Sequence, residues 1–297
     1  MADIASTFSR LIRFNPKSSP TSVSIGEPVD SSIDVGLAVL KGEDVRVTVF
    51  SGNSVLSPGQ KTDKTETVGK LLSPLAQSEV GTIRCIGLNY TSHAREMSLD
   101  IPTVPTLFMK PDTSLADPFP TSSTILPKIT QIDGTGDYES EMAIVLGKDA
   151  KNVPETEALE YVLGYTASND VSSRTSQMNQ SQWCFSKGFD GACPLGPVLV
   201  SANTIRDVSK LSIRGLKNGV VMQEATPLTD LIFSVEKLVS FLSQGTTLRA
   251  GTVILTGTPP GVGAAKSPKE FLVPGDEFHV KISGGVGTLV SRFEAQA

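Results

Sequence analysis

The sequence predicts a strand-dominated α+β fold, and three observations lead to that prediction. Most apolar stretches are short and partly β-branched, as buried strands are. Glycine (26 residues) and proline (19 residues) interrupt the chain frequently, and only a few stretches suggest a helix. This pattern favours a mixed fold over a doubly wound α/β fold. With 297 residues, 39% of them hydrophobic, the chain is long enough for a substantial core.

Residues 1–80 are predicted to form a small β-rich N-terminal subdomain without a recognisable catalytic constellation. Strands are expected at 11–14, 34–40 and 45–50, with Gly, Pro and Ser between them. Residues 67–72 are expected to make one helical turn before Pro74. The sequence pattern changes near residue 81, so residues 81–297 are expected to form the larger domain.

The larger domain is predicted to contain many strands, one hairpin and two helices. The strands are expected at 83–88, 107–110, 142–146, 165–169, 194–200, 252–256, 277–283 and 287–293. Asn218-Gly219 is a strong turn signal for a hairpin over 213–222. Helices are expected at 154–163 and, with Ser234 as N-cap and Gly245 beyond its end, at 235–244. The polar, aperiodic segment 171–188 is predicted to be a functional loop.

Composition narrows the classes of function. The net charge is −5 with no basic patch, so no nucleic-acid partner is expected. No stretch approaches the roughly 18 apolar residues of a membrane span, so no membrane partner is expected. The three cysteines, Cys85, Cys184 and Cys193, form no CxxC pair and are expected to be buried, reduced thiols.

The expected compartment is the cytosol. The first residues, Met1 to Ala5, lack the basic and apolar regions of a secretory signal. A mitochondrial location is the alternative, because Arg10, Arg13 and Lys17 lie among serines, although Asp3 argues against it.

Two carboxylates are the centre of the functional prediction. Glu139 and Glu141 stand two apart beside the apolar run 142–146, and residues i and i+2 of a strand point to the same face. Like charges that close need compensation, and a divalent metal can supply it. Oxygen-only ligands select Mg²⁺, Mn²⁺ or possible Ca²⁺. Asp170 is the best third ligand because it also ends a predicted strand.

Alternatives to this metal site remain on spacing grounds. Asp133 and Asp190 compete with Asp170 as the third ligand, and the two glutamates could instead be solvated side chains at a strand end. The loop 257–263 could bring backbone N–H groups close to an anion. It lacks the Lys-Ser/Thr ending of a phosphate-binding loop, so nucleotide binding is not expected.

Only two histidines are present, which excludes most zinc-hydrolase sites. His279 shares the polar face of a predicted strand and is expected at the surface. His93 is therefore the candidate base, and Glu96, three residues later, lies within reach on a helical turn. Lys187 lies in a glycine-flanked loop, where a lysine is ordinarily solvated.

These features occur together in one known family. The chain resembles the fumarylacetoacetate hydrolase family across roughly residues 81–295, including its 2-hydroxyhepta-2,4-diene-1,7-dioate isomerase-like members. The matching motifs, in chain order, are Gly87-Leu88-Asn89-Tyr90 with His93 and Glu96, Asp137-Tyr138-Glu139-Ser140-Glu141, Ser168-Asn169-Asp170-Val171-Ser172-Ser173-Arg174, Lys187-Gly188-Phe189-Asp190 with Pro194-Leu195-Gly196-Pro197, Asn218-Gly219 with Gln223, and Thr256-Gly257-Thr258-Pro259-Pro260-Gly261-Val262-Gly263. The order and number of these motifs make the resemblance specific.

The resemblance implies a fold, an assembly and a set of roles. The fold is a mixed β-sandwich roll with a few peripheral helices, assembled as a homodimer. The implied metal ligands are Glu139, Glu141 and Asp170, the acid–base pair is His93 and Glu96, the active-site lysine is Lys187, and the substrate contacts are Gln223 and Thr258. The stretch 223–227 departs from many members, and that departure bears on substrate identity.

The leading hypothesis is a metal-dependent hydrolase that cleaves a carbon–carbon bond beside a carbonyl in a small 2-oxo or 1,3-dioxo acid of the acylpyruvate type. Cleavage would pass through a metal-stabilised enolate, with His93 activating water. The rivals are an oxaloacetate decarboxylase and an isomerase or tautomerase of an unsaturated oxo-diacid. A non-catalytic binding protein is disfavoured because the whole set of candidate residues is present.

Overall fold

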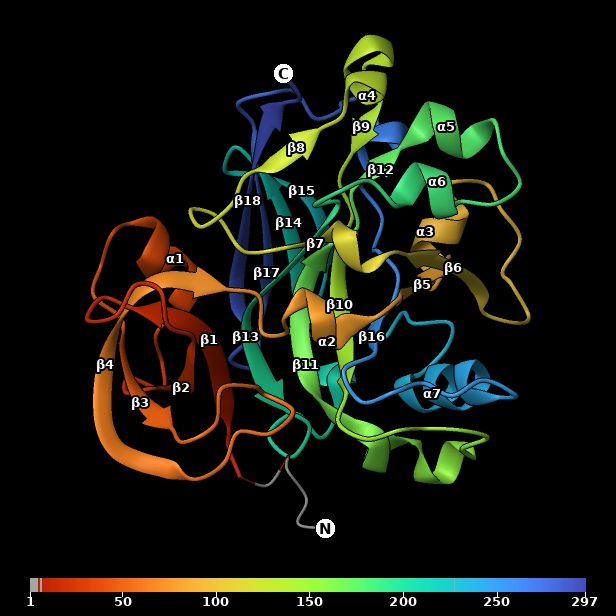
Figure 1. Ribbon diagram of the computed structural model, residues 1–297. Coiled ribbons are helices and arrows are strands. Elements are labelled where there is room, and N and C mark those ends of the chain that lie inside the picture. The colour runs from red at the N-terminus through yellow and green to blue at the C-terminus, as the bar shows by residue number, and fades with distance from the viewer. Residues whose placement is uncertain (1–4, 6, 227) are drawn as a thin grey trace.

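The computed structural model describes residue 5, residues 7–226 and residues 228–297, and it has the predicted strand-dominated α+β fold (Figure 1). The strands are β1 (Arg10–Pro16), β2 (Ser24–Pro28), β3 (Arg46–Phe50), β4 (Lys61–Leu72), β5 (Ile83–Gly87), β6 (Thr106–Lys110), β7 (Leu115–Ala116), β8 (Thr124–Leu126), β9 (Gly136–Asp137), β10 (Ser140–Leu146), β11 (Val162–Asn169), β12 (Ser172–Ser173), β13 (Cys193–Ser201), β14 (Ile213–Lys217), β15 (Val220–Ala225), β16 (Val253–Leu255), β17 (Glu277–Ile282) and β18 (Gly287–Ala295). The helices are α1 (Val35–Leu40), α2 (Gln77–Val80), α3 (Thr91–Glu96), α4 (Lys128–Asp133), α5 (Arg174–Met178), α6 (Cys184–Lys187) and α7 (Val235–Ser243). Short 3₁₀ turns are η2 (Asp112–Ser114), η3 (Glu155–Tyr161), η4 (Val208–Lys210) and η5 (Gly263–Ala265).

The first four strands close on themselves. Strand β1 pairs with both β2 and β4, and each of these also pairs with β3, so the N-terminal strands form a ring. The start of β1 then pairs with β13, where Arg10 lies opposite Val200. This pairing joins the ring to a larger sheet, whose path continues through β13, β11, β10, β16, β5 and β6. In Figure 1 the ring lies to the left of this sheet.

Strand β10 lies in the middle of the large sheet and is buried along its whole length. Its even-numbered side chains, Met142, Ile144 and Leu146, pack into the core shared with the five-stranded sheet β15-β14-β17-β18-β8. Its odd-numbered side chains, Ala143 and Val145, pack into a second core on the other face. Burial on both faces explains why the sequence reads as a continuous apolar run without alternation.

Four local predictions of secondary structure are wrong. The segment 171–188 is not one loop, because it contains β12, α5 and α6. Residues 34–40 are not a strand: Asp34 caps helix α1 by accepting a hydrogen bond from Leu37 N, and it also binds Thr288 across the fold. Residues 67–72 are not a helical turn but the end of the long strand β4. Residues 154–163 form the 3₁₀ turn η3 and the start of β11 in place of an α-helix. In the last three cases, contacts with distant segments accompany the observed structure, and a local pattern does not contain those contacts.

Other local predictions are confirmed. The hairpin β14–β15 turns at Asn218-Gly219, and α7 begins after Ser234, whose hydroxyl accepts a hydrogen bond from Lys237 N. Cys85 and Cys193 are buried as expected, whereas Cys184 is exposed.

The structure bears differently on the two predictions about targeting segments at the N-terminus. Met1 to Ile4, on which the signal-sequence prediction partly rests, and Ser6, one of the serines behind the mitochondrial alternative, lie outside the described residues. Arg10 and Arg13, which motivated the mitochondrial alternative, are part of strand β1, and Arg10 donates hydrogen bonds to the carbonyl groups of Ser31, Ile33 and Gly285. None of the described helices reaches the length and apolarity that a membrane crossing requires.

Candidate metal centre and active site

Strand register brings three carboxylates together at one end of the large sheet. Strands β10 and β11 are antiparallel, with Ser140 opposite Asn169 and Glu141 opposite Ser168. The first residue before β10, Glu139, therefore lies beside the first residue after β11, Asp170, and Asp170 N donates to Glu139 O at 2.9 Å. Ligand oxygens of Glu139, Glu141 and Asp170 lie within 4.8 Å of one another, and all three residues are buried.

Two buried lysines and the partly buried Arg174 surround this acidic cluster. Lys187 Nζ lies 2.6 Å from Glu139 Oε2 and 2.9 Å from Asp170 Oδ2. Arg174 contacts Glu139 Oε1 at 2.7 Å, and Lys110 Nζ lies 2.7 Å from Asp170 Oδ1. Ion pairs in such a buried setting need close geometry to offset the cost of removing the charges from water, and these distances provide it.

Two of these cations, Lys187 and Arg174, contact Glu139, and the pKa values of Glu139 and Glu141 shift in opposite directions. Burial would raise the pKa of Glu139, but the charges of Lys187 and Arg174 outweigh it and lower this pKa to about 2. Burial and the neighbouring charges of Asp170 and Glu139 instead raise the pKa of Glu141 well above its usual value. The carboxylate of Glu141 accepts a hydrogen bond from Gly257 N at 2.7 Å. Glu141 is thus the carboxylate of the cluster whose charged form is least favoured without a metal ion.

These residues fit a divalent cation by their chemistry. They offer oxygen ligands only, which is the donor set that hard cations such as Mg²⁺ and Mn²⁺ prefer. A cation would also relieve the repulsion that raises the pKa of Glu141. The two competing aspartates do not join the cluster: Asp133 accepts hydrogen bonds from Thr135, and Asp190 is exposed.

The two predicted acid–base residues form a direct pair on helix α3. His93 Nδ1 lies 2.9 Å from Glu96 Oε2, and the Glu96 carboxylate accepts Gly261 N at 2.9 Å. Burial would raise the pKa of Glu96, but the hydrogen bonds from His93 and Gly261 lower it, so this carboxylate is an acceptor. Nδ1 of His93 therefore carries the proton, which leaves Nε2 as the basic nitrogen. The other histidine, His279, is on β17, half-buried beside Glu277.

One loop after β16 holds carboxylates from both groups. The N–H of Gly257 binds Glu141 of the metal cluster, and the N–H of Gly261 binds Glu96 of the acid–base pair. Gly263 N and Ala264 N, directly after them, donate to Asp137 at 2.8 and 2.9 Å. The prediction that loop 257–263 brings N–H groups to an anion is confirmed, and the anions are carboxylates of the protein itself.

The two predicted substrate contacts have different surroundings. Thr258 lines the cavity beside the cluster, and its hydroxyl donates to Ser140 O at 3.0 Å. Gln223 is 1% exposed and is absent from the cavity lining. Its amide donates to Thr258 Oγ1 and Pro259 O and accepts from Ser140 N, so it supports Thr258 from behind. Pro227, in the stretch that departs from the family, lies outside the described residues.

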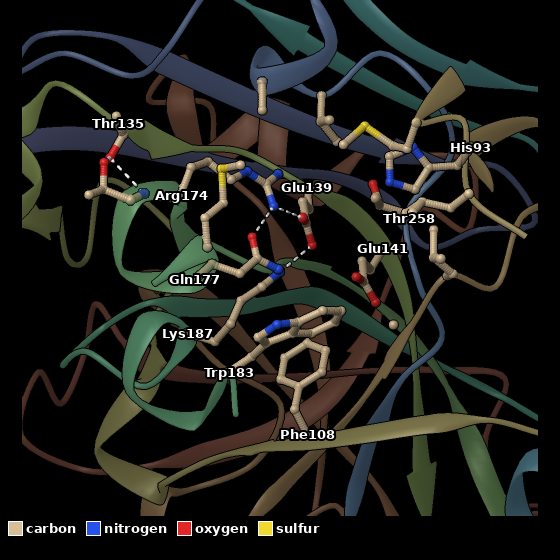
Figure 2. A pocket seen from close by; sticks show the side chains of 18 of the residues that line it. His93, Phe108, Thr135, Glu139, Glu141, Arg174, Gln177, Trp183, Lys187 and Thr258 are labelled. Carbon is tan, nitrogen blue, oxygen red and sulfur yellow. Dashed lines mark hydrogen bonds and ion pairs between the residues drawn. The ribbon is translucent and has the colours of Figure 1, made fainter. Parts of the chain in front are cut away.

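A cavity of about 520 Å³ opens beside these groups. Glu139, Glu141, His93, Thr258 and Lys187 line one part of it, and Figure 2 shows their side chains converging from different elements. Much of the remaining wall is apolar, from Leu88, Met97, Leu99, Phe108, Met178 and Trp183 among others. Its size is in the ordinary range for ligand pockets, about 300–1,000 Å³.

Sequence reasoning assigned no role to Lys110 or Arg174. Arg174 is the last residue of the Asp170 motif, and it pairs with both Asp137, at 2.8 Å, and Glu139. The sequence did contain a reason to consider Arg174. Buried carboxylates need nearby cations, and Arg174 lies in the same predicted loop as Lys187. Lys110 ends a strand of otherwise ordinary composition, and no local pattern marks it as 0% exposed.

The comparisons with known proteins point to one family. The family model described as fumarylacetoacetate (FAA) hydrolase C-terminal matches residues 82–294. The chain is 42% identical over 300 residues to a caffeoylpyruvate hydrolase of Neonothopanus nambi, covering 100% of this chain and 96% of that one. It is 38% identical to a mitochondrial oxaloacetate tautomerase of Rattus norvegicus, over 74% of this chain and 68% of that one. Among solved structures, a 2-hydroxyhepta-2,4-diene-1,7-dioate isomerase from Mycobacterium marinum matches with a TM-score of 0.78 and 28% identity, covering 98% of this chain and 100% of that one.

Proposed function

Because this chain belongs to the fumarylacetoacetate hydrolase family and is an enzyme, we propose that it is a metal-dependent hydrolase of acylpyruvates. The reaction adds water to the acyl carbonyl and breaks the bond between that carbonyl carbon and the neighbouring methylene, giving a carboxylic acid and pyruvate. The observation that carries the proposal is the presence of the acidic cluster and the His93–Glu96 pair at one cavity. The caffeoylpyruvate hydrolase, which aligns with the whole chain, supports the substrate class.

Glu139, Glu141 and Asp170 hold Mg²⁺ or Mn²⁺ in this proposal. The bound ion supplies a Lewis acid for the adjacent carboxylate and 2-oxo oxygens of the substrate. Lys187 remains cationic, because burial would lower its pKa but the charges of Asp170 and Glu139 raise it. Its ammonium group therefore offers a fixed positive charge beside the place where negative charge develops during cleavage.

His93 is the base that removes a proton from water. Nδ1 faces Glu96, and His93 itself lines the cavity, so Nε2 is the nitrogen that can accept this proton. Glu96 keeps the ring oriented and stabilises the imidazolium that forms, in the way that a carboxylate supports histidine in other hydrolases. Gly261 N fixes Glu96 in turn.

A paired assay tests the proposal. Protein loaded with Mg²⁺ or Mn²⁺ is expected to convert acetylpyruvate to acetate and pyruvate, and a chelator is expected to abolish this conversion. Glu139→Ala should lose metal and activity, whereas Asp190→Ala, which removes an exposed carboxylate outside the cluster, should keep both. Metal binding is measured separately, from the loss of the free Mn²⁺ signal in electron paramagnetic resonance. Chelator-resistant hydrolysis, or equal metal binding by the two variants, would refute the metal assignment.

The second candidate function is decarboxylation or tautomerisation of oxaloacetate. The oxaloacetate tautomerase of Rattus norvegicus, 38% identical, favours it. The same metal cluster serves this chemistry, but no water has to be activated at His93. Loss of oxaloacetate without loss of acetylpyruvate, and with full activity in His93→Ala, would select this candidate.

The proposal also covers the assembly, the location and the domain division of the protein. We infer a homodimer in the cytosol, with residues 1–80 as a subdomain and residues 81–297 as the catalytic domain; the match of the family model to residues 82–294 supports that division. Light scattering on the purified protein gives the molar mass, and a value of one chain, 31.4 kDa, would contradict the dimer.

A further inference from the structure

The wall of the cavity below Lys187 and Glu141 is aromatic. Figure 2 shows the indole of Trp183 beneath these two side chains, with the ring of Phe108 below it. The two rings meet edge to face, with centroids 5.5 Å apart and planes at 64°. This geometry is favourable for an aromatic pair. Phe108 is 3% exposed, so it anchors the half-buried Trp183 from the protein side.

A glycine makes room for the indole. A Cβ atom added to Gly87, the last residue of β5, would lie 2.5 Å from Trp183 Cζ3 and 3.1 Å from Cη2. Carbon atoms do not approach that closely, so the six-membered ring of the indole fits against Gly87 only because the side chain is missing. The indole position is thus determined from two sides, by Gly87 and by Phe108.

The same wall is tied to the active-site lysine. Trp183 directly precedes helix α6, and its carbonyl accepts hydrogen bonds from Lys187 N and Ser186 Oγ, both at 3.0 Å. Lys187 Nζ lies 5.0 Å from the centre of the Phe108 ring. The aromatic wall and the charged end of Lys187 therefore belong to one short, locally bonded unit.

We propose that Trp183, seated on Gly87 and Phe108, forms the main wall of a subsite for a planar aromatic acyl group, and that it determines the enzyme's preference among acylpyruvates. The inference rests on the proposed function, because the acidic cluster must hold the pyruvate portion. It goes further by naming the residue that reads the acyl portion. Aromatic substrates gain from stacking on a rigid, desolvated ring, whereas an acetyl group offers no ring to stack.

One feature of the rim supports a different substrate. Lys269 also lines the cavity and is exposed, so it could attract a second carboxylate at the far end of a di-acid. The test therefore needs three substrates: acetylpyruvate, benzoylpyruvate and fumarylpyruvate, which have a methyl, an aromatic and an acidic acyl group.

The main experiment compares kcat/KM for these substrates in the parent enzyme and four variants. The parent should prefer benzoylpyruvate to both others. Trp183→Ala should lower the benzoylpyruvate-to-acetylpyruvate ratio about tenfold, mostly through KM, which corresponds to the usual value of an aromatic contact. Trp183→Phe should restore most of that ratio, and Gly87→Ala should lower it by displacing the indole. Phe185→Ala, on the outer side of the same helix and absent from the cavity lining, is the matched control.

A binding measurement separates this inference from the proposed function. Trp183 is the only tryptophan in the chain, so its fluorescence reports directly on the wall. Titration with benzoate, the aromatic acid product of benzoylpyruvate, should change the emission of the parent protein, whereas acetate should not. Gly87→Ala should weaken that response.

The outcomes have distinct meanings. A parent enzyme that prefers fumarylpyruvate, or a Trp183→Ala variant whose substrate ratio stays within twofold, would overturn the subsite while leaving acylpyruvate hydrolysis intact. Failure to hydrolyse all three substrates would refute the proposed function. The fluorescence titration would then decide the subsite alone, and no response to benzoate would refute it.

Discussion

Replacement of Lys110 by methionine should destabilise the protein severely. The Lys110 ammonium is 0% exposed and donates to three main-chain carbonyl groups, those of Val171, Lys187 and Ala192. It also lies 2.7 Å from Asp170 Oδ1. Methionine has a similar length and no charge, so Lys110→Met removes these interactions while filling nearly the same space.

The size of the effect follows from these contacts. A buried carbonyl that loses its donor costs about 1–3 kcal/mol. Removal of one partner from a buried ion pair costs about 3–5 kcal/mol. Asp170 keeps Lys187 as a partner at 2.9 Å, so the lower values apply. Ala192 O keeps Val171 N as a donor at 3.1 Å. Two carbonyls and one carboxylate then give about 5 kcal/mol, which is comparable with the whole stability of a typical domain, about 5–15 kcal/mol.

Urea unfolding, followed by circular dichroism and by the emission of Trp183, measures this loss. Lys17→Met is the matched control, because Lys17 is 57% exposed and its pair with Asp44 lies at the surface. The control should change stability by less than about 1 kcal/mol. If Lys110→Met also unfolded within about 1 kcal/mol of the parent, the reasoning would be refuted, and the buried ammonium would contribute no more than an apolar side chain of its size.

Three further predictions concern the catalytic groups. His93→Ala should lower kcat for acetylpyruvate by a factor of about 10²–10⁴ while Mn²⁺ binding persists, and a steady-state assay showing an undiminished kcat would remove His93 from the role of base. Burial and neighbouring charges raise the pKa of Glu141 above 4.5, so the metal-free folded protein holds a proton there that the unfolded chain releases. The free energy of unfolding should therefore fall as pH rises from about 4.5 through the raised pKa. Binding of Mn²⁺ should release the same proton. Calorimetry in two buffers with different ionisation enthalpies measures the release, and identical apparent enthalpies would contradict it. Gly261→Ala should lower kcat, because the added Cβ would lie 2.0 Å from Met222 O and the φ of Gly261 is 105°. The loop would have to move away from Glu96. A kcat equal to that of the parent would show that the hydrogen bond from Gly261 N to Glu96 is dispensable.

Short-range patterns predicted the centre of the site well. Glu139 and Glu141 could be placed on one face because strand geometry has a period of two, and Asp170 could be preferred because it ends a strand. Whether β10 and β11 are neighbours, and in which register, is a long-range property that the residues alone did not reveal. The His93–Glu96 pair lies within one helical turn, so its contact was also predictable from spacing.

The errors have a common physical origin. The stretch 34–40 carries apolar residues that suit either a strand or a short helix, and contacts of Asp34 with Thr288, 254 residues away, accompany the helix. Strand β4 is mostly polar because much of it is exposed, so its apolar signal is weak. Lys110 was missed for a related reason: a buried lysine is explained by its partners, and all four partner groups come from residues 170–192.

The division between sheet and rim has a consequence for how this protein can acquire new substrates. The carboxylates proposed to bind the metal are held by the ends of β10 and β11 and by the loop after β16, whereas the wall proposed to contact the acyl group comes from Trp183, directly before α6, and from side chains at the rim. A mutation at Trp183 changes the shape of the wall without touching a carboxylate of the cluster. Single substitutions at the rim can therefore change which acyl group the cavity accepts, and each such substitution leaves the carboxylates of the cluster in place.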